Sequence, residues 1–396
     1  MSLTYLDYAA TAPMLPEVKR KMLEVMDGSY GNASSLHGPG HAAAEIIEEA
    51  REHVARLINA EPEEIIFTSG GSEANNTVME IFRGKRIAVS SIEHPSVLEA
   101  ARVRAGELTT LEVNRTGRVD PAEVPAEQDL VSVMLANNEL GTIEPVAEIV
   151  KRCKKYNTSD ARTTFVHTDA TQALGKIKID VRALGVDYMT ISAHKLGGPI
   201  GVGALYVRKG AQFTPLIYGG HQEQKRRAGT SNTAAIAGLG AAAKWAWDNW
   251  SCRQYAAVAK LRDELCARIL AEVPYSSANG VEKCCKNDNT YDMETAMTLP
   301  NILNMSFQAA EGESIQLYLD TEGIIVSTGS ACAAGDIQPS HVLMATTGDA
   351  EIAHSSIRFS LGPSTTKADI ERVMQVLPGV VKRLQDISTV KIKEEL

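Results

Sequence analysis

Five strand-like runs, each passing directly into small polar residues, constrain the fold of this 396-residue chain most strongly. The runs are Glu64–Thr68, Arg86–Val89, Leu130–Leu135, Thr164–His167 and Asp187–Ile191. Segments with helical spacing lie between several of them, including Pro95–Ala105 and Val146–Tyr156. Strands that alternate with helices predict an α/β fold with a mostly parallel, helix-covered sheet. Because ligands bind outside the carboxyl ends of such strands, we expect the polar residues there to form one site.

The chain is longer than one hydrophobic core usually supports, which predicts two domains. We place a large domain at residues 13–250, and a smaller α+β domain at residues 1–12 and 251–396. A helix over Gln254–Glu272 is expected to lead into the second domain. Its strands are expected at Asn301–Phe307 and Ser356–Ser360, and its last helix begins near Thr366, where Thr366 and Asp369 suit a capping box.

Composition excludes several classes of protein. A net charge of -9 argues against general binding to nucleic acid or to an anionic membrane. No apolar run is long enough to cross a bilayer, and the first residues do not resemble a signal peptide. The six cysteines show neither zinc-site spacing nor a dense disulfide framework, so we expect no metal site and a cytoplasmic location.

The last of the five runs leads into Ser192-Ala-His-Lys195, which places a lysine at the end of a buried strand. An ammonium buried without a partner costs several kcal/mol or loses its proton. A lysine that gives up its proton easily is a candidate for Schiff-base chemistry. Taken alone, a lysine at a strand end more often faces solvent.

The other strand ends carry residues that each have two interpretations. Ser69-Gly-Gly-Ser72 could offer backbone N–H groups to an anion at a helix N-terminus, or form an ordinary glycine-rich turn. Asp169 could hold a protonated ring nitrogen of a cofactor, or cap a helix. His94 could stack on an aromatic ring or relay protons, or be structural. Asn138 and Gln172 could donate hydrogen bonds to a phenolic oxygen, or belong to turns.

In combination these residues favour one cofactor. An anion cradle, a carboxylate for a pyridinium nitrogen and a lysine for an imine are what proteins supply to pyridoxal phosphate. A dinucleotide site needs G-x-G-x-x-G with a downstream acid, and a P-loop needs Gly-Lys-Ser/Thr; Ser69–Ser72 provides neither. The sequence therefore predicts a site for pyridoxal phosphate.

Two features in the second half of the chain refine the chemistry. Cys332 lies among small residues, which favours an accessible nucleophilic thiol over a buried filler. Arg358 lies inside a strand-like run, where it could pair bidentately with a substrate carboxylate or form an internal salt bridge. The Arg227–Thr230 stretch could supply a second phosphate contact, or be a loop before a helix.

These motifs resemble the cysteine desulfurases, which are enzymes of the class V aminotransferase fold, from about Tyr5 to Asp386. The resemblance rests on Tyr5–Thr11, Phe67–Glu73, Glu93-His94, Asn137–Glu139, Asp169–Gln172, Ser192–Lys195, Arg227–Thr230, Gly329–Cys332 and Ser355–Gly362. The Gly-Ser-Ala-Cys form is similar to the group that serves iron–sulfur cluster assembly and nitrogen fixation. The resemblance implies fold type I of the pyridoxal-phosphate enzymes and a homodimer.

The resemblance also implies the catalytic roles. Lys195 would hold the cofactor as a Schiff base and later move protons, and His94 would stack on the ring. Cys332 would attack the sulfur of cofactor-bound L-cysteine, giving a persulfide and L-alanine. The persulfide sulfur would pass to an acceptor protein, either an iron–sulfur scaffold or another carrier for thio-cofactor or tRNA synthesis.

The binding roles follow from the same resemblance. Asp169 would pair with the pyridinium nitrogen, and Gln172 and Asn138 would address the phenolic oxygen. Arg358 and Asn138 would bind the substrate carboxylate. The phosphate would be held by Gly71, Ser72, Ser192 and His194, with Thr230 reaching the cofactor of the partner subunit.

Two departures from the family pattern leave questions open. The 279–298 segment is longer than expected, and its Cys284 and Cys285 match no family role. The chain stops at Leu396, without the tail by which housekeeping members dock a cluster scaffold, so the sulfur acceptor stays open. The alternatives are a selenocysteine lyase and an inactive homologue that acts as a binding partner.

Overall fold

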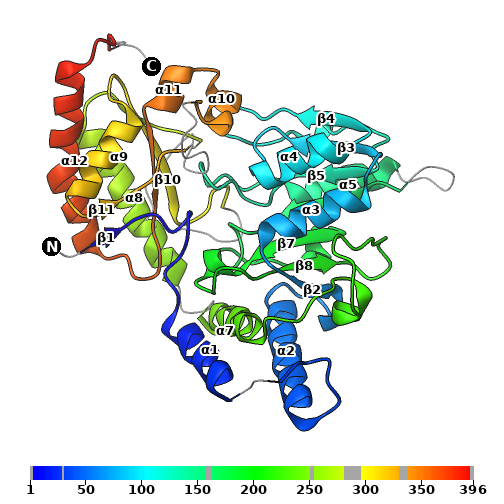
Figure 1. Cartoon of the computed structure of the whole chain (residues 1–396). Helices are drawn as coiled ribbons and strands as arrows, with labels where there is room; N and C mark the ends of the chain where they lie inside the picture. Colours follow the sequence, from blue (N-terminus) through cyan, green and yellow to red (C-terminus); the bar gives the residue numbers. More distant parts are fainter. Residues whose placement is uncertain are drawn as a thin grey trace.

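The computed structural model describes residues 3–28, 31–156, 163–249, 254–280, 296–329 and 338–392. Its centre is a seven-stranded sheet in the order β2-β8-β7-β6-β5-β3-β4 (Figure 1). The strands are β2 Ile65–Thr68, β3 Arg86–Ser90, β4 Glu107–Leu111, β5 Leu130–Ser132, β6 Phe165–Asp169, β7 Tyr188–Ser192 and β8 Gly203–Val207.

Strand directions bring the predicted strand ends to one edge. Neighbours from β7 through β6, β5 and β3 to β4 pair in parallel. Strand β8 runs antiparallel to both β7 and β2, so β2 points the same way as β7. All five predicted strands therefore end at the same edge of the sheet, and the predicted mostly parallel sheet is confirmed.

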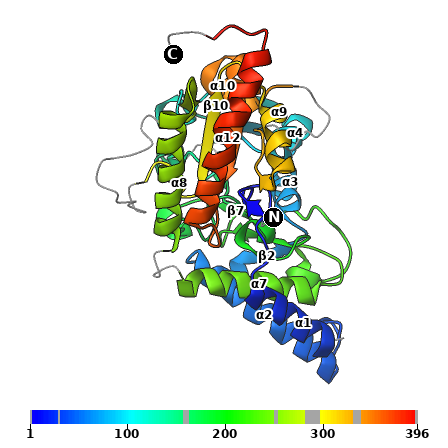
Figure 2. The same ribbon diagram turned by 90° about the vertical axis from the view of Figure 1, so that its left-hand side faces the viewer.

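Helices cover both faces of this sheet, and the alternation of side chains along a strand explains why. On β2, Ile65 and Phe67 pack into one hydrophobic cluster and Ile66 into another. The first cluster holds residues of α2 (Gly38–Leu57), α5 (Val146–Tyr156) and α7 (Thr233–Asn249), and the second those of α3 (Gly71–Ile81) and α4 (Pro95–Arg104). Helix α1 (Pro16–Gly28) packs beside α7 (Figures 1 and 2).

A second, smaller sheet in the order β12-β10-β9 lies beside the long helices α8 and α12 (Figure 2). Its core includes Leu6 from the N-terminal segment together with Phe307 and Phe359. This packing supports the proposed domain that joins residues 1–12 to the C-terminal part. The elements are β1 Thr4–Tyr5, α8 Gln254–Glu272, β9 Ser276–Ala278, β10 Ile302–Phe307, α9 Gly312–Thr321, β11 Ile324–Ile325, α10 His341–Thr347, α11 Ala350–His354, β12 Ser356–Ser360 and α12 Lys367–Ile387.

Some predicted boundaries differ from the structure. The run expected to end at Leu135 gives a strand that ends at Ser132, because the Met134 N–H leaves the sheet and donates to the Glu93 carboxylate at 2.6 Å. Strand β4 was not predicted, since it is an edge strand with mostly exposed residues. The capping box of Thr366 and Asp369 is confirmed. Most of the 279–298 segment, with Cys284 and Cys285, lies outside the described residues.

No helix within the described ranges is both long enough and apolar enough to span a membrane.

Candidate active site

A chain of hydrogen bonds joins three of the strand ends. The Asn75 amide of α3 donates to Asp169 Oδ2 at 2.8 Å and to Ser96 Oγ at 2.9 Å. Ser96 Oγ in turn lies 2.8 Å from Nδ1 of His94. Asp169, at the end of β6, also accepts from the Thr171 N–H at 2.9 Å. The buried carboxylate is thus fixed from both sides and linked to His94.

The contacts of His94 determine the tautomer of its neutral ring. Nδ1 accepts from the backbone N–H of Ser96 at 3.1 Å, so the proton of a neutral imidazole sits on Nε2. Burial lowers the pKa of His94, with Lys195 and His341 acting in the same direction and Asp169 opposing them. His94 is therefore neutral near pH 7, and its side chain has a fixed orientation.

Lys195 lies in the turn η3 (Ala193–Leu196) directly after β7 and contacts the N-terminal segment. Its Nζ donates to the carbonyl oxygens of Ala9 at 2.6 Å and Ala10 at 2.5 Å. The Gln172 amide donates to the same Ala9 oxygen at 2.9 Å. Lys195 and Gln172 thus share one acceptor, the backbone oxygen of Ala9, which lies more than 160 positions before Gln172 in the sequence.

The start of α3 lies against the ends of β6 and β7. A Cβ added to Gly71 would lie 3.4 Å from Thr171 Oγ1 and 3.6 Å from the Ser192 Cβ. The N-cap residue, Gly70, provides no side-chain cap, so the first N–H groups of the helix receive no hydrogen bond from it. Such a helix start attracts anions.

Two predicted phosphate residues lie nearby with other contacts. His194 Nδ1 is 3.2 Å from Thr11 Oγ1, and burial together with Lys195 and Lys176 lowers its pKa to about 4. Arg227 does not face this region freely, because it forms a bidentate ion pair with Glu73 of α3 at 2.9 and 3.1 Å.

Arg358 of β12 is buried and held by the other domain and the N-terminal segment. It pairs with Asp7 at 2.8 Å and donates to the carbonyl oxygen of Asn138 at 3.1 Å. Its Nε is buried and has no hydrogen-bond partner among the described residues. Arg358 thus forms the internal salt bridge of one interpretation. It also retains a free Nε–H donor among the described residues, which the other interpretation, pairing with a substrate carboxylate, would use.

The structure does not bring every predicted residue into this group. Thr230 lies on an exposed stretch before α7, and no hydrogen bond within the described residues joins it to the site. Ser72 is exposed on the first turn of α3. Cys332 lies outside the described residues, so its role stays a prediction.

Sequence reasoning missed four residues that contact the predicted ones: Asp7, Asn75, Ser96 and Lys176. Asp7 and Arg358 are 351 positions apart, and no local pattern signals that pair. A local pattern does point to Ser96. An N-cap side chain accepts from the backbone N–H two or three positions on, and Ser96 stands two positions after the N-cap residue His94. Lys176 stands four positions after Gln172, and the sequence does not distinguish it from its exposed neighbour Lys178.

Three buried carboxyl groups surround the site. Burial raises the pKa of Glu93 to about 8, with the charges of Asp169 and Glu144 adding to the shift. Burial likewise raises the pKa of Glu144 to about 8 and of Glu139 to about 7. A carboxyl whose pKa is higher in the folded state stabilises the fold fully below its unfolded pKa, and this stability is lost as pH rises through the folded pKa.

Glu93→Gln is therefore expected to flatten the pH dependence of stability. The amide keeps an oxygen for Ser90 and the Met134 N–H but cannot ionise, so part of the loss between about pH 4.5 and 8 disappears. The check is the free energy of unfolding against pH. Glu107→Gln, at an exposed position, should keep the wild-type profile. A Glu93→Gln profile as steep as that of the wild type would contradict this assignment.

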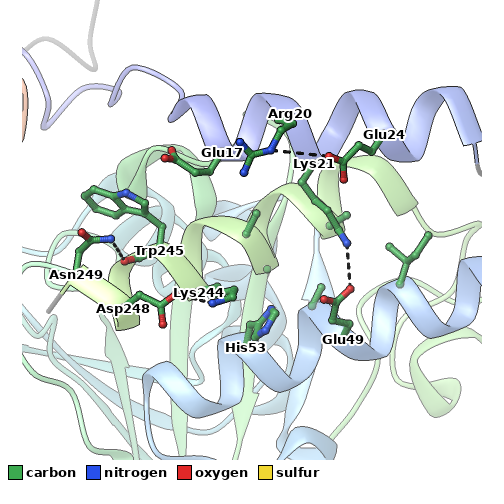
Figure 3. A pocket seen from close by; sticks show the side chains of 15 residues that line it. Glu17, Arg20, Lys21, Glu24, Glu49, His53, Lys244, Trp245, Asp248 and Asn249 are labelled. Atoms are coloured by element: carbon green, nitrogen blue, oxygen red, sulfur yellow. Dashed lines mark hydrogen bonds and ion pairs between the residues drawn. The ribbon is translucent and has the colours of Figure 1, made fainter.

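A pocket of about 380 Å³ lies away from these residues, between α1, α2 and α7 (Figure 3). Lys21 of α1 pairs with Glu49 of α2 across it at 3.1 Å, and Lys244 pairs with Asp248 along α7 at 2.5 Å. It contains none of the predicted site residues. A smaller pocket of about 180 Å³ is lined by Lys195 and Lys176.

Comparison with known proteins matches nearly the whole chain to one family. The family model for class-V aminotransferases matches residues 4–373. A cysteine desulfurase IscS of Dictyoglomus turgidum is 43% identical over 98% of this chain and 96% of its own length. A cysteine desulfurase IscS of Methanosarcina thermophila is 39% identical over 98% of this chain and 95% of its own length.

Several solved structures are similar to this chain over most of its length. A NifS-like protein from Rickettsia africae has a TM-score of 0.84 and 33% identity, over 96% of this chain and all of that one. A protein solved as SspA in complex with cysteine has a TM-score of 0.74 and 30% identity, over 91% of this chain and 99% of that one. These likenesses confirm the predicted fold class. The chain belongs to the class-V aminotransferase family.

Proposed function

We propose that this chain is a cysteine desulfurase that uses pyridoxal phosphate to move sulfur from L-cysteine to Cys332. The main structural support is that Lys195 and Asp169 lie at the ends of neighbouring strands, where residues of other elements hold each of them by hydrogen bonds. The names of the relatives support the proposal, since two of them are cysteine desulfurases and one similar structure was solved with cysteine.

The described residues fit the cofactor in three respects. The uncapped start of α3 at Gly71 suits a phosphate. Thr171 Oγ1 is buried beside that start without a hydrogen-bond partner among the described residues, which leaves a hydroxyl for a ligand. Asp169 offers a carboxylate suited to a protonated ring nitrogen. The other cofactor contacts that we propose are Lys195, Gly71, Ser72, Ser192, His194, Asn138, Gln172 and Thr230.

When bound, pyridoxal phosphate supplies an electron sink, so the protein needs no strong base to break a carbon–sulfur bond. The Asn75 amide and the Thr171 N–H donate to the two oxygens of Asp169 and so hold its carboxyl group in a fixed orientation. His94 presents a fixed ring whose Nε2 carries the proton. Lys195 moves protons at its Nζ, which the carbonyl oxygens of Ala9 and Ala10 hold in position.

Arg358 and Asn138 are the proposed residues for the substrate carboxylate. The Arg358 guanidinium is held in place by Asp7 and by the backbone of Asn138. Its buried Nε lacks a hydrogen-bond partner among the described residues, and a carboxylate would supply one. Replacing arginine by lysine would lose the planar arrangement of donors that such pairing needs.

The sulfur step balances without an outside oxidant. The Cys332 thiolate forms a sulfur–sulfur bond with the substrate sulfur while the carbon–sulfur bond of L-cysteine breaks. The electron pair of the broken bond ends in a carbon–hydrogen bond of L-alanine. The chain is left with a persulfide on Cys332, which we propose is passed to an acceptor protein for iron–sulfur cluster assembly.

The assembly and location are also proposals. A homodimer would account for Thr230, which is exposed here and would reach the cofactor of the partner subunit. The cytoplasmic location remains a prediction from the cysteine content.

Cys332→Ala is expected to reduce sulfide and L-alanine formation from L-cysteine, with a reductant present, by about a hundredfold or more, because the nucleophile is lost. The matched control is Cys153→Ala, since the Cys153 thiol is buried in α5 and burial raises its pKa to about 11. This control should keep wild-type turnover per folded enzyme.

Three results would count against the proposal. If Cys332→Ala kept full sulfide production, the persulfide route would be wrong. If it lost activity on L-cysteine but kept full activity on L-selenocysteine, the selenocysteine lyase would become the better assignment. Wild-type protein that stays colourless with added pyridoxal phosphate would favour the inactive homologue.

A further inference from the structure

Lys176 is a fully buried lysine outside the predicted site, 2% exposed. Its Nζ donates to the backbone oxygen of Gln172 at 2.7 Å and to Gln172 Oε1 at 3.2 Å. Within the described part of the chain it forms no ion pair with a carboxylate. An ammonium buried with only neutral acceptors is costly, and a methionine would fill similar space without that cost. Filling the core therefore does not explain this residue.

The two contacts of the Gln172 side chain fix its orientation. An ammonium only donates, so the oxygen of the amide must face Lys176. The carbonyl of Ala9 only accepts, so the NH₂ group must face Ala9, at 2.9 Å. Lys195 donates to that same Ala9 oxygen. Lys176 thus orients the NH₂ group of Gln172 toward the Ala9 oxygen, which also accepts from Lys195 Nζ.

The charges around Lys176 are mostly of one sign. Burial lowers the pKa of Lys176 to about 7, and the charges of Lys195 and Arg358 act in the same direction. Lys176 in turn contributes to the lowered pKa of His194. The phenols of Tyr8 and Tyr255 line the same pocket as the two lysines. The carboxylate of Asp7 is paired with Arg358. In its protonated form, Lys176 is therefore a source of positive potential beside Lys195.

We propose that Lys176 is a positioning residue for the cofactor site, which orients the Gln172 amide and sets the positive potential at Lys195. This proposal rests on the proposed function, because the orientation of Gln172 matters to the reaction only if the cofactor binds at Lys195. It assigns to Lys176 two effects, a hydrogen bond and a charge, which different substitutions separate.

Lys176→Met removes both effects. We expect pyridoxal phosphate to bind the apoprotein about tenfold more weakly, as measured by quenching of tryptophan fluorescence, since one hydrogen bond to the Gln172 amide is lost. A nearby cation disfavours the protonated form of a group, so removing Lys176 should favour it. We therefore also expect the midpoint of the pH titration of the holoenzyme's visible absorption to rise by roughly one pH unit. Lys178→Met, an exposed lysine two positions on, is the matched control and should change neither value.

Lys176→Gln separates the two effects and also serves if the methionine variant fails to fold. Its amide can still donate to Gln172 but carries no charge. Cofactor affinity should return to near the wild-type value while the upward shift of the midpoint remains. A purely structural role would lower thermal stability without moving this midpoint.

The outcomes are distinct. Wild-type midpoints in both Lys176 variants would overturn the inference while leaving the proposed function intact. A wild-type protein without any visible absorption after addition of pyridoxal phosphate would instead overturn the proposed function.

Discussion

Lys195→Ala is expected to reduce the formation of L-alanine from L-cysteine by about 10³-fold or more. The substitution removes both the amine that would hold the cofactor covalently and the group that would move protons. The reason is positional: Lys195 ends at the carbonyls of Ala9 and Ala10, beside Gln172, at the edge where five strands end. The measurement is single-turnover production of L-alanine.

The control for this prediction is Lys209→Ala, because Lys209 is an exposed lysine after β8 at the opposite edge of the sheet. It should retain wild-type turnover. The Lys195→Ala protein should also lose its cofactor on dialysis while keeping its fold, judged by circular dichroism. Substantial turnover, or a cofactor that still resists dialysis, would rule out the covalent role of Lys195.

Arg51→Met is expected to lower the free energy of unfolding by about 3–5 kcal/mol, the range for breaking a buried ion pair by removing one partner. Arg51 binds both oxygens of Glu223, at 2.8 and 3.0 Å, and both side chains are buried. The pair also covers the free edge of β2. Arg51 donates to the Ile65 oxygen at 2.8 Å, and Glu223 accepts from the Phe67 N–H at 3.0 Å.

This pair also secures a strained turn. Glu223 begins three successive residues with positive φ, at 45°, 56° and 66°, a conformation that costs roughly 1–2 kcal/mol per non-glycine residue. Without Arg51, the carboxylate of Glu223 stays buried and loses its counter-charge. The turn lies just before Arg227 and Thr230, so a loosened turn should also weaken the homodimer if Thr230 reaches the partner.

Urea unfolding followed by circular dichroism tests the stability effect. Arg56→Met on the same helix is the matched control, since Arg56 is exposed and stacks over Trp247, and it should cost about 1 kcal/mol or less. The double variant Arg51→Met with Glu223→Met should lose less stability than the sum of the single variants. Additive losses would show that the two side chains do not act as a pair.

The sequence was sufficient for the parts of the fold that local patterns determine. The five apolar runs between helical segments predicted β2, β3, β5, β6 and β7, and these are the strands whose ends form the site. Strand β4 escaped prediction because exposed edge positions carry no apolar pattern. The antiparallel insertion of β8 between β2 and β7 depends on long-range pairing, which periodicity does not encode.

The site was predictable to the extent that its residues follow strands directly. His94, Asp169 and Lys195 were predicted as site residues because each stands at or just after the end of an apolar run. Asn75 and Lys176 were not found, because they act by contacting a predicted residue from inside another helix or turn. A buried polar side chain in an apolar stretch is indistinguishable in sequence from an exposed one until packing is known.

The most direct test of the central claim is the mass of the peptide that contains Cys332 after the wild-type holoenzyme has reacted with L-cysteine. The proposed function predicts that this peptide gains the mass of one sulfur atom and that L-alanine appears in equal amount. Reduction should return the peptide to its original mass. Release of L-alanine with no added sulfur on Cys332, or no L-alanine at all, would contradict the account.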